Sequence, residues 1–237
     1  MLTFARLAVA LLFATTVLAG KRGLCWTYCE FHLNDLGVFN NGDGQVVAIY
    51  DYETYPPPST NGNGGLGFIG IPIADLASRQ ASQGWATVFT LNEPDINGIT
   101  PSQAASWYIQ YINPLAIKKA LPAVTSSATS GQGLSWVSQM ISACAGQCYF
   151  DYINLSYIES AHNQFPNYQL VITEVASFQQ AFPFLDGASY VQLYFPFVAT
   201  SPALLQANQP SDVTYVGTGS CLYNDDGTPS AVGNLMY

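Results

Sequence analysis

Charged side chains are scarce in this chain of 237 residues, because Asp, Glu, Lys and Arg together make up only 9% of it. Six residues are Lys or Arg, so the net charge is −9 and the isoelectric point lies near 4.3. A protein that binds nucleic acid or an anionic membrane needs a basic surface. The composition therefore argues against both partners and favours a neutral ligand.

Histidine is also scarce, and two common functional motifs are absent from the sequence. The chain has two histidines, His32 and His162, and His162 lies in a helical pattern with no ligand partner nearby in sequence. Structural and catalytic zinc sites use clusters of His and Cys. The chain contains neither a phosphate-binding glycine loop nor a Gly-x-Ser-x-Gly motif. We therefore expect no metal and no cofactor.

Only one long apolar run occurs in the chain. It spans Leu7–Leu18, follows the basic start at Arg6 and ends in small residues before Gly20. This pattern is typical of a secretory signal peptide, and the run is too short to span a bilayer comfortably. We expect a leader over residues 1–19, a single domain over residues 20–237, no membrane segment after cleavage, and a secreted protein of the extracellular space or cell wall.

The five cysteines are an odd number, which leaves at least one outside any intramolecular disulfide. A secreted chain forms disulfides readily. Cys144 and Cys148 follow a helical stretch at a short spacing and are a candidate pair that closes a small loop.

The order of apolar runs predicts the fold. Strand patterns cover Gly23–Thr27, Val46–Asp51, Gly67–Ile71, Ala86–Asn92, Leu121–Thr125, Tyr149–Leu155, Leu170–Glu174 and Tyr190–Phe195. Helical patterns cover Ala74–Gln83, Ser102–Ala120, Gly133–Cys144, Tyr157–Phe165 and Ser177–Leu185. Thr100 and Pro101 form a typical helix start. Eight strands with helices between them predict an α/β fold, a single (β/α)8 TIM barrel.

Two glutamates end predicted strands. The apolar, β-prone run Thr87–Asn92 leads into Glu93, and Pro94 then stops the strand. The run Tyr168–Thr173 ends in the same way at Glu174. Catalytic groups of α/β barrels collect at such strand ends, and a retaining glycosidase needs two carboxyl groups. One such glutamate is more often an exposed turn residue, but two among five glutamates favour a catalytic pair.

These motifs together resemble glycoside hydrolase family 128, which belongs to clan A and contains secreted fungal endo-β-1,3-glucanases. The resemblance covers nearly all of the expected mature chain, in the order of the family. It rests on Lys21–Trp26, Leu91–Asp95, Leu134–Trp136, Ile172–Glu174 and the aromatic last strand.

The resemblance implies a role for three residues. Glu93 matches the acid/base at the end of the fourth strand, and Glu174 matches the nucleophile at the end of the seventh. Asn92 matches the asparagine that binds the sugar 2-hydroxyl next to the cleaved bond.

Aromatic residues make up 14% of the chain, and rings stack on the apolar faces of sugars. Trp26, Tyr50 and Tyr194 lie near predicted strand ends and are candidate sugar platforms. Packing in the core is an equally good interpretation of each ring.

Three connections depart from the family pattern. Relatives carry a His-Trp-Tyr-Gly-like stretch after the sixth strand, whereas here Leu155 runs almost directly into the helical pattern from Tyr157. The segments after Gly70 and Glu174 are also short. The resemblance therefore predicts a barrel with shortened connections after strands three, six and seven. A divergent relative and a gene model with lost segments both explain this pattern.

Three functions are compatible with the sequence. The first is a retaining endo-β-1,3-glucanase of cell walls that acts as a monomer on a β-glucan polysaccharide or oligosaccharide. The second is a wall protein that binds glucan on the same barrel with weakened turnover, which the missing stretch after the sixth strand favours. The third is a clan A hydrolase of another β-glucan linkage.

Overall fold

A computed structural model describes most of the chain, and the statements below concern the described residues. These are 20–26, 36–51, 67–70, 76–84, 86–155, 158–175 and 178–237. The expected leader, residues 1–19, lies outside them. The three junctions where shortened connections were expected, 71–75, 156–157 and 176–177, also lie outside the described residues.

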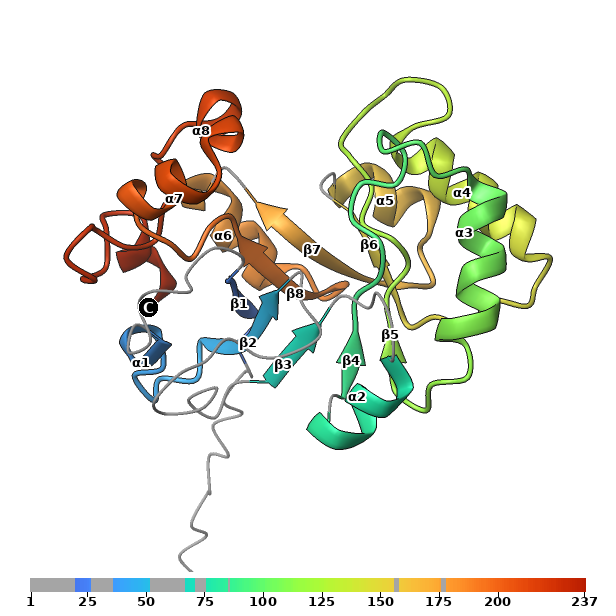
Figure 1. The fold of residues 1–237 in the computed structure, drawn as a ribbon, viewed down its shortest axis with the longest axis horizontal. Helices are drawn as coiled ribbons and strands as arrows, with labels where there is room; N and C mark the ends of the chain where they lie inside the picture. Colours follow the sequence, from blue (N-terminus) through green and yellow to red (C-terminus); the bar gives the residue numbers. More distant parts are fainter. Residues whose placement is uncertain are drawn as a thin grey trace, which may run out of the picture.

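Eight parallel strands form one sheet in the order β5-β4-β3-β2-β1-β8-β7-β6 (Figure 1). The strands are β1 Arg22–Cys25, β2 Val46–Asp51, β3 Gly67–Gly70, β4 Thr87–Val88, β5 Lys118–Lys119, β6 Tyr152–Asn154, β7 Gln169–Val175 and β8 Val191–Pro196. The expected parallel α/β architecture is therefore present.

The two edges of the sheet meet. Isolated parallel bridges join Ala120 to Tyr152 and Val124 to Leu155, beyond the ends of the edge strands. The Leu121 amide donates to the Tyr152 carbonyl at 2.9 Å. The sheet is therefore curled, so that the residues after β5 lie beside β6.

Three aromatic rings fill the inside of the curled sheet. Tyr50 of β2, Phe89 after β4 and Phe195 of β8 are fully buried. Their ring centroids lie 5.5–5.6 Å from one another. Gly23 of β1 makes room for them, because a Cβ at this position would overlap the Phe195 ring. Residues of three strands that are not neighbours thus share one core.

Helices cover the outer surface of the sheet. They are α1 Leu36–Phe39, α2 Leu76–Gln83, α3 Pro101–Trp107, the π-helix η1 Tyr108–Ile112, α4 Gly133–Cys144, α5 Ile158–Gln164, α6 Phe178–Gly187, α7 Pro202–Asn208, α8 Pro210–Val216 and the 3-10 helix η2 Gly233–Met236. The α3–α5 group lies on one side of the sheet and α6–α8 on the other (Figure 1). No helix within the described ranges is long and apolar enough to cross a membrane.

The start of α3 agrees with its sequence signal. Thr100 accepts a hydrogen bond from the Gln103 amide, and the Gln103 side chain accepts one from the Thr100 amide. This capping box and Pro101 at the first helical position pair the free donors of the helix terminus. The side chains of Tyr108 and Trp136 then pack α3, η1 and α4 against the outer face of β4 and β6.

The prediction of one helix over Ser102–Ala120 was wrong, and the fifth strand begins earlier than the predicted Leu121–Thr125, within which Ala123 and Val124 form isolated parallel bridges. The helix ends before Pro114, and β5 occupies Lys118–Lys119. Two lysines in succession are typical of an exposed helix surface. The Lys119 side chain is buried instead, and its ammonium group donates to the Ile117 carbonyl at 2.9 Å. A local hydrogen bond therefore lets a charged residue occupy a buried strand position.

Tyr194 lies on the outer face of β8 in a polar network. Its hydroxyl donates to Asp186 at 2.8 Å and accepts from the Arg22 guanidinium at 3.0 Å. Arg22 also forms an ion pair with Asp186 at 2.7 Å. The prediction that Tyr194 is a sugar platform is therefore wrong, because the ring has no exposed surface and faces α6.

Replacement of Tyr194 by Phe is expected to lower the free energy of unfolding by about 1 kcal/mol, because two hydrogen bonds in a partly buried network are lost. Urea unfolding followed by circular dichroism would measure this change. Tyr215→Phe is the matched control, since Tyr215 is 91% exposed. Equal stability of the two variants would contradict a structural role for the Tyr194 hydroxyl.

Candidate active site

Glu93 follows β4 in a backbone that is held on both sides. Asn92 forms a parallel bridge to Ala123, and the Glu93 amide donates to the Ala123 carbonyl at 2.7 Å. The Glu93 carbonyl accepts from the amides of Ile96 and Asn97. Glu93 has a φ of +44°, in the left-handed region that residues other than glycine seldom adopt. Such strain is concentrated at functional sites, where the surroundings hold it in place.

The Glu93 side chain is half-buried, and its environment disfavours the charged form. Burial is the main reason that the pKa of Glu93 is raised, and the negative charges of Asp95 and Asp212 raise it further. Asp212 lies on α8, far away in the sequence. A carboxyl group with a raised pKa stays protonated at higher pH, as a general acid requires.

Glu174 lies near the carboxyl end of β7 and is half-buried. The pairing of β7 with β8 shifts register between Ile172 and Val175, and bulges of this kind redirect side chains near active sites. Next to it, the Thr173 hydroxyl donates to the buried Asn154 side chain of β6 at 3.2 Å. This hydrogen bond ties the end of β7 to its neighbour.

Glu93 and Glu174 therefore both lie at the carboxyl edge of the sheet, because all the pairings run parallel. β4 and β7 are separated only by β5 and β6 once the sheet edges meet. A half-buried acid and a second carboxyl group at one edge provide the groups for acid-assisted cleavage of a glycosidic bond.

Asp95 fixes the loop that follows β4. Its carboxylate accepts from the Thr125 hydroxyl at 2.6 Å and from the Gly133 amide at 2.8 Å. Gly133 opens α4 with a φ of +54°, and a Cβ there would overlap the Ser127 carbonyl. One carboxylate thus joins the Glu93 segment to the loop after β5 and to the start of α4.

The other two candidate platforms are packing residues as well. Tyr50 belongs to the ring cluster inside the sheet and has no exposed surface. Trp26 is 3% exposed and packs edge-on against Tyr223, with ring centroids 5.8 Å apart. A stacking platform must present a ring face to the sugar. The structure therefore contradicts this prediction for both residues.

The structure joins Cys144 to Cys148 by a disulfide with Cα atoms 5.5 Å apart, as their spacing suggested. The bridge closes the turn after α4 at the amino edge of the sheet, before β6. Among the residues that the structure describes, no group of three His, Cys, Asp or Glu side chains could hold a metal ion.

Two acidic residues of the site were missed at the sequence level. Asp95 stands two residues after Glu93, and its place in the motif is a usable signal. Asp212 carries no such signal, because it lies on α8, far from Glu93 in the sequence, and its charge acts on Glu93 only in the folded chain.

Comparison with known families identifies the class of protein that this fold and site define. The family model described as glycosyl hydrolase catalytic core matches residues 23–236, so the chain belongs to this family.

Solved structures give the finer assignment. The chain is 66% identical to a subgroup IV endo-β-1,3-glucanase of glycoside hydrolase family 128 from Lentinula edodes, over 92% of this chain and 100% of that one, with a TM-score of 0.89. The expected membership of family 128 is confirmed. A subgroup III exo-β-1,3-glucanase from Blastomyces gilchristii, solved with glucose, shares the fold at 21% identity and a TM-score of 0.72, over 92% of this chain and 97% of that one.

A curated relative is much longer than this chain. The chain is 28% identical over 251 residues to alkali-sensitive linkage protein 1 of Schizosaccharomyces pombe (strain 972 / ATCC 24843). The match covers 92% of this chain and 44% of that protein, so the chain spans less than half of the relative's length.

Replacement of Asp95 by Ala is expected to lower the free energy of unfolding by about 2–3 kcal/mol, because the buried Gly133 amide and Thr125 lose a charged acceptor. Thermal unfolding followed by circular dichroism would measure this change. Asp226→Ala is the control, since Asp226 accepts similar hydrogen bonds from Thr228 in an exposed turn. If both variants unfold at the same temperature, Asp95 does not fix the loop.

Proposed function

We propose that this protein is a retaining hydrolase of cell-wall β-1,3-glucan. The observation that carries the proposal is the pair Glu93 and Glu174 at the carboxyl edge of a parallel sheet. Its support is the 66% identity to a solved endo-β-1,3-glucanase over nearly the whole chain.

The finer fold proposal is a closed (β/α)8 barrel. The bridges beyond β5 and β6 and the shared aromatic interior support it. In such a barrel the catalytic groups lie at the carboxyl ends of the strands. A closed ring also explains how strands four and seven present carboxyl groups to one sugar.

The mechanism that we propose has two displacements. The Glu174 carboxylate attacks the anomeric carbon while the Glu93 carboxyl donates its proton to the glycosidic oxygen, which releases the first product. Glu93, now a carboxylate, removes a proton from water, and the oxygen of that water attacks the same carbon and frees Glu174. Carboxyl groups about 5–5.5 Å apart support this route. Two inversions at one carbon retain the anomeric configuration.

Asn92 is the residue that we propose for substrate binding. It directly precedes Glu93, is half-buried, and its backbone is paired with Ala123. A side-chain amide at this position can donate a hydrogen bond to the 2-hydroxyl of the reacting sugar, and such a bond strengthens as positive charge develops on the ring.

We also propose that the protein is secreted after removal of residues 1–19 and acts as a monomer in the extracellular space or cell wall. The signal-like start of the chain and the fungal glucanase relatives support this location.

The function is tested by incubation of the protein with β-1,3-, β-1,4- and β-1,6-linked glucans, with reducing ends measured over time. Release from β-1,3-glucan alone supports the proposal, and release from another linkage refutes the substrate. Binding of β-1,3-glucan by calorimetry without any release would identify a binding protein with weakened turnover. Proton NMR of the first product decides the stereochemistry, since an initial α-anomer refutes retention.

Replacement of Glu93 or Glu174 by Gln is expected to lower kcat/KM roughly a thousandfold or more, because each variant loses a group that acts directly in bond cleavage. The double variant should be little worse than either single one, since both residues serve one mechanism. Initial rates on soluble β-1,3-glucan would measure the effect, with Asp226→Asn as the exposed control. Near-normal activity of either Gln variant would disprove the assignment.

Replacement of Asp212 by Asn is expected to move the alkaline limb of the kcat/KM profile to lower pH. Asp212 raises the pKa of Glu93, so loss of its charge lets Glu93 lose its catalytic proton earlier as the pH rises. Rates measured across the pH range at constant ionic strength would detect the shift. Asp226→Asn removes the same charge in a distant turn, and an equal shift in that control would contradict a local effect of Asp212.

A further inference from the structure

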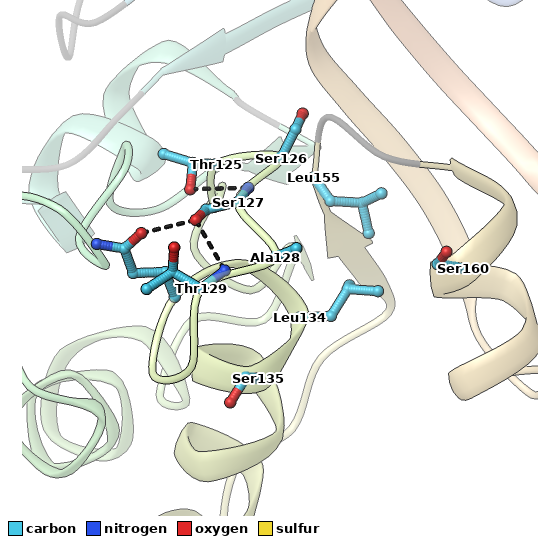
Figure 2. A pocket seen from close by; sticks show the side chains of 10 residues that line it. Thr125, Ser126, Ser127, Ala128, Thr129, Leu134, Ser135, Leu155 and Ser160 are labelled. Carbon is cyan, nitrogen blue, oxygen red and sulfur yellow. Dashed lines mark hydrogen bonds between the residues drawn. The ribbon is translucent and has the colours of Figure 1, made fainter.

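A pocket of about 430 Å³ lies beside the carboxyl edge of the sheet, where the two sheet edges meet (Figure 2). Its walls come from three elements: the loop after β5, with Thr125, Ser127 and Ala128; the start of α4, with Leu134; and the β6–α5 region, with Leu155 and Ser160. Small-ligand sites commonly enclose about 300–1,000 Å³. The pocket therefore has room for a small saccharide.

The pocket wall is attached to the catalytic segment. Asp95, two residues after Glu93, accepts hydrogen bonds from Thr125 at one end of the loop and from Gly133 at the other. Within the loop, the Ser127 hydroxyl donates to Gln132 at 2.7 Å and accepts from the Thr129 amide at 3.1 Å. The loop is thus internally bonded and held in a fixed relation to Glu93.

The lining is neutral and suits a sugar. It consists of hydroxyl, amide and aliphatic side chains. The hydroxyls of Thr129 and Ser160 make no hydrogen bond to any other described residue, so they can bind a ligand. Leu134 and Leu155 lie on the same side of the loop as Ala128, with Ser160 on the facing wall (Figure 2). Aliphatic groups beside hydroxyls match the apolar faces and the hydroxyl rim of a glucosyl unit.

We propose that this pocket is an accessory site for a glucosyl unit of the β-1,3-glucan chain, apart from the unit that is cleaved. The inference rests on the proposed function, because the ligand is a distal part of the same substrate. The neutral lining fits an uncharged polysaccharide. The hydrogen bonds that Thr125 and Gly133 donate to Asp95 hold the pocket wall in a fixed position relative to Glu93. A chain long enough to reach the pocket gains contacts that a short chain lacks.

The test fills the pocket and compares oligosaccharide lengths. Ala128→Phe places a ring among Leu134, Leu155 and Ser160. Ser130→Phe is the matched control, since Ser130 is an exposed residue of the same loop outside the pocket lining. Ser160→Phe fills the pocket from the α5 side and guards against a folding defect of the first variant. Circular dichroism spectra and melting temperatures check all three.

Binding is measured by calorimetry with a β-1,3-linked trisaccharide and with a hexasaccharide, each variant being combined with Glu174→Gln to prevent turnover. The ratio of the hexasaccharide affinity to the trisaccharide affinity should fall about tenfold in Ala128→Phe and Ser160→Phe and stay unchanged in Ser130→Phe. A tenfold change in affinity corresponds to about 1.4 kcal/mol of binding free energy.

The possible outcomes separate this inference from the proposed function. If the unmodified protein cleaves glucan normally and all variants show an equal dependence of affinity on chain length, only the proposal of an accessory site is overturned. Loss of the length dependence on pocket filling, in a protein that releases no reducing ends, supports the pocket and overturns the hydrolase. Absence of any oligosaccharide binding overturns both.

Discussion

The contact among Tyr50, Phe89 and Phe195 is the interaction on which the rest of the structure depends. The rings come from β2, from the residue after β4 and from β8, and each centroid lies within 5.6 Å of the other two. A flat sheet would keep these strands apart, because β3 separates β2 from β4 and β1 separates β2 from β8. Burial of a large side chain contributes about 1.5–3 kcal/mol, and three rings at one point favour curvature strongly. This packing requires glycine at position 23, because the Cβ of any other residue there would overlap the Phe195 ring.

Curvature of the sheet brings Glu93 and Glu174 closer together than an open sheet would. Glu93 and Glu174 are 81 positions apart by their numbers (174 − 93), and in an open sheet they would belong to strands separated by four others. Once β6 lies beside the residues after β5, only two strands separate them. The backbone of Glu93 is then held by Ala123, and the end of β7 is held to β6 through Thr173 and Asn154. A retaining mechanism depends on such fixed spacing, because one carboxyl group attacks the anomeric carbon and the other protonates the glycosidic oxygen bonded to it.

The sequence predicted what depends on local pattern. β2 and α4 have the expected bounds, and Thr100 caps α3. Glu93 follows β4, and Glu174 lies one residue before the end of β7. The errors arise where tertiary contacts override local pattern. The helical pattern predicted over Ser102–Ala120 included Lys118 and Lys119, yet this segment pairs with β4. Tyr50 and Tyr194 are near strand ends, but a period-two pattern does not state which face is covered by another layer. One ring therefore lies inside the sheet and the other lies beneath α6. The contribution of α8 to the site depends on chain folding beyond β8, which no local motif encodes.

Asp95 links Glu93, the proposed catalytic acid, to the wall of the neighbouring pocket. Its negative charge helps to keep Glu93 protonated, while its oxygens hold Thr125 and the first residue of α4. Hydrogen bonds to a carboxylate are stronger than those between neutral groups, and a negative charge close to a second acid raises the pKa of that acid. Three donors, the Thr125 amide, the Thr125 hydroxyl and the Gly133 amide, hold the Asp95 side chain in place beside the Glu93 segment. Burial remains the main cause of the raised pKa of Glu93, and Asp95 adds to it. The same Asp95 side chain orders the loop after β5, so one residue contributes both to the environment of Glu93 and to the position of the pocket wall.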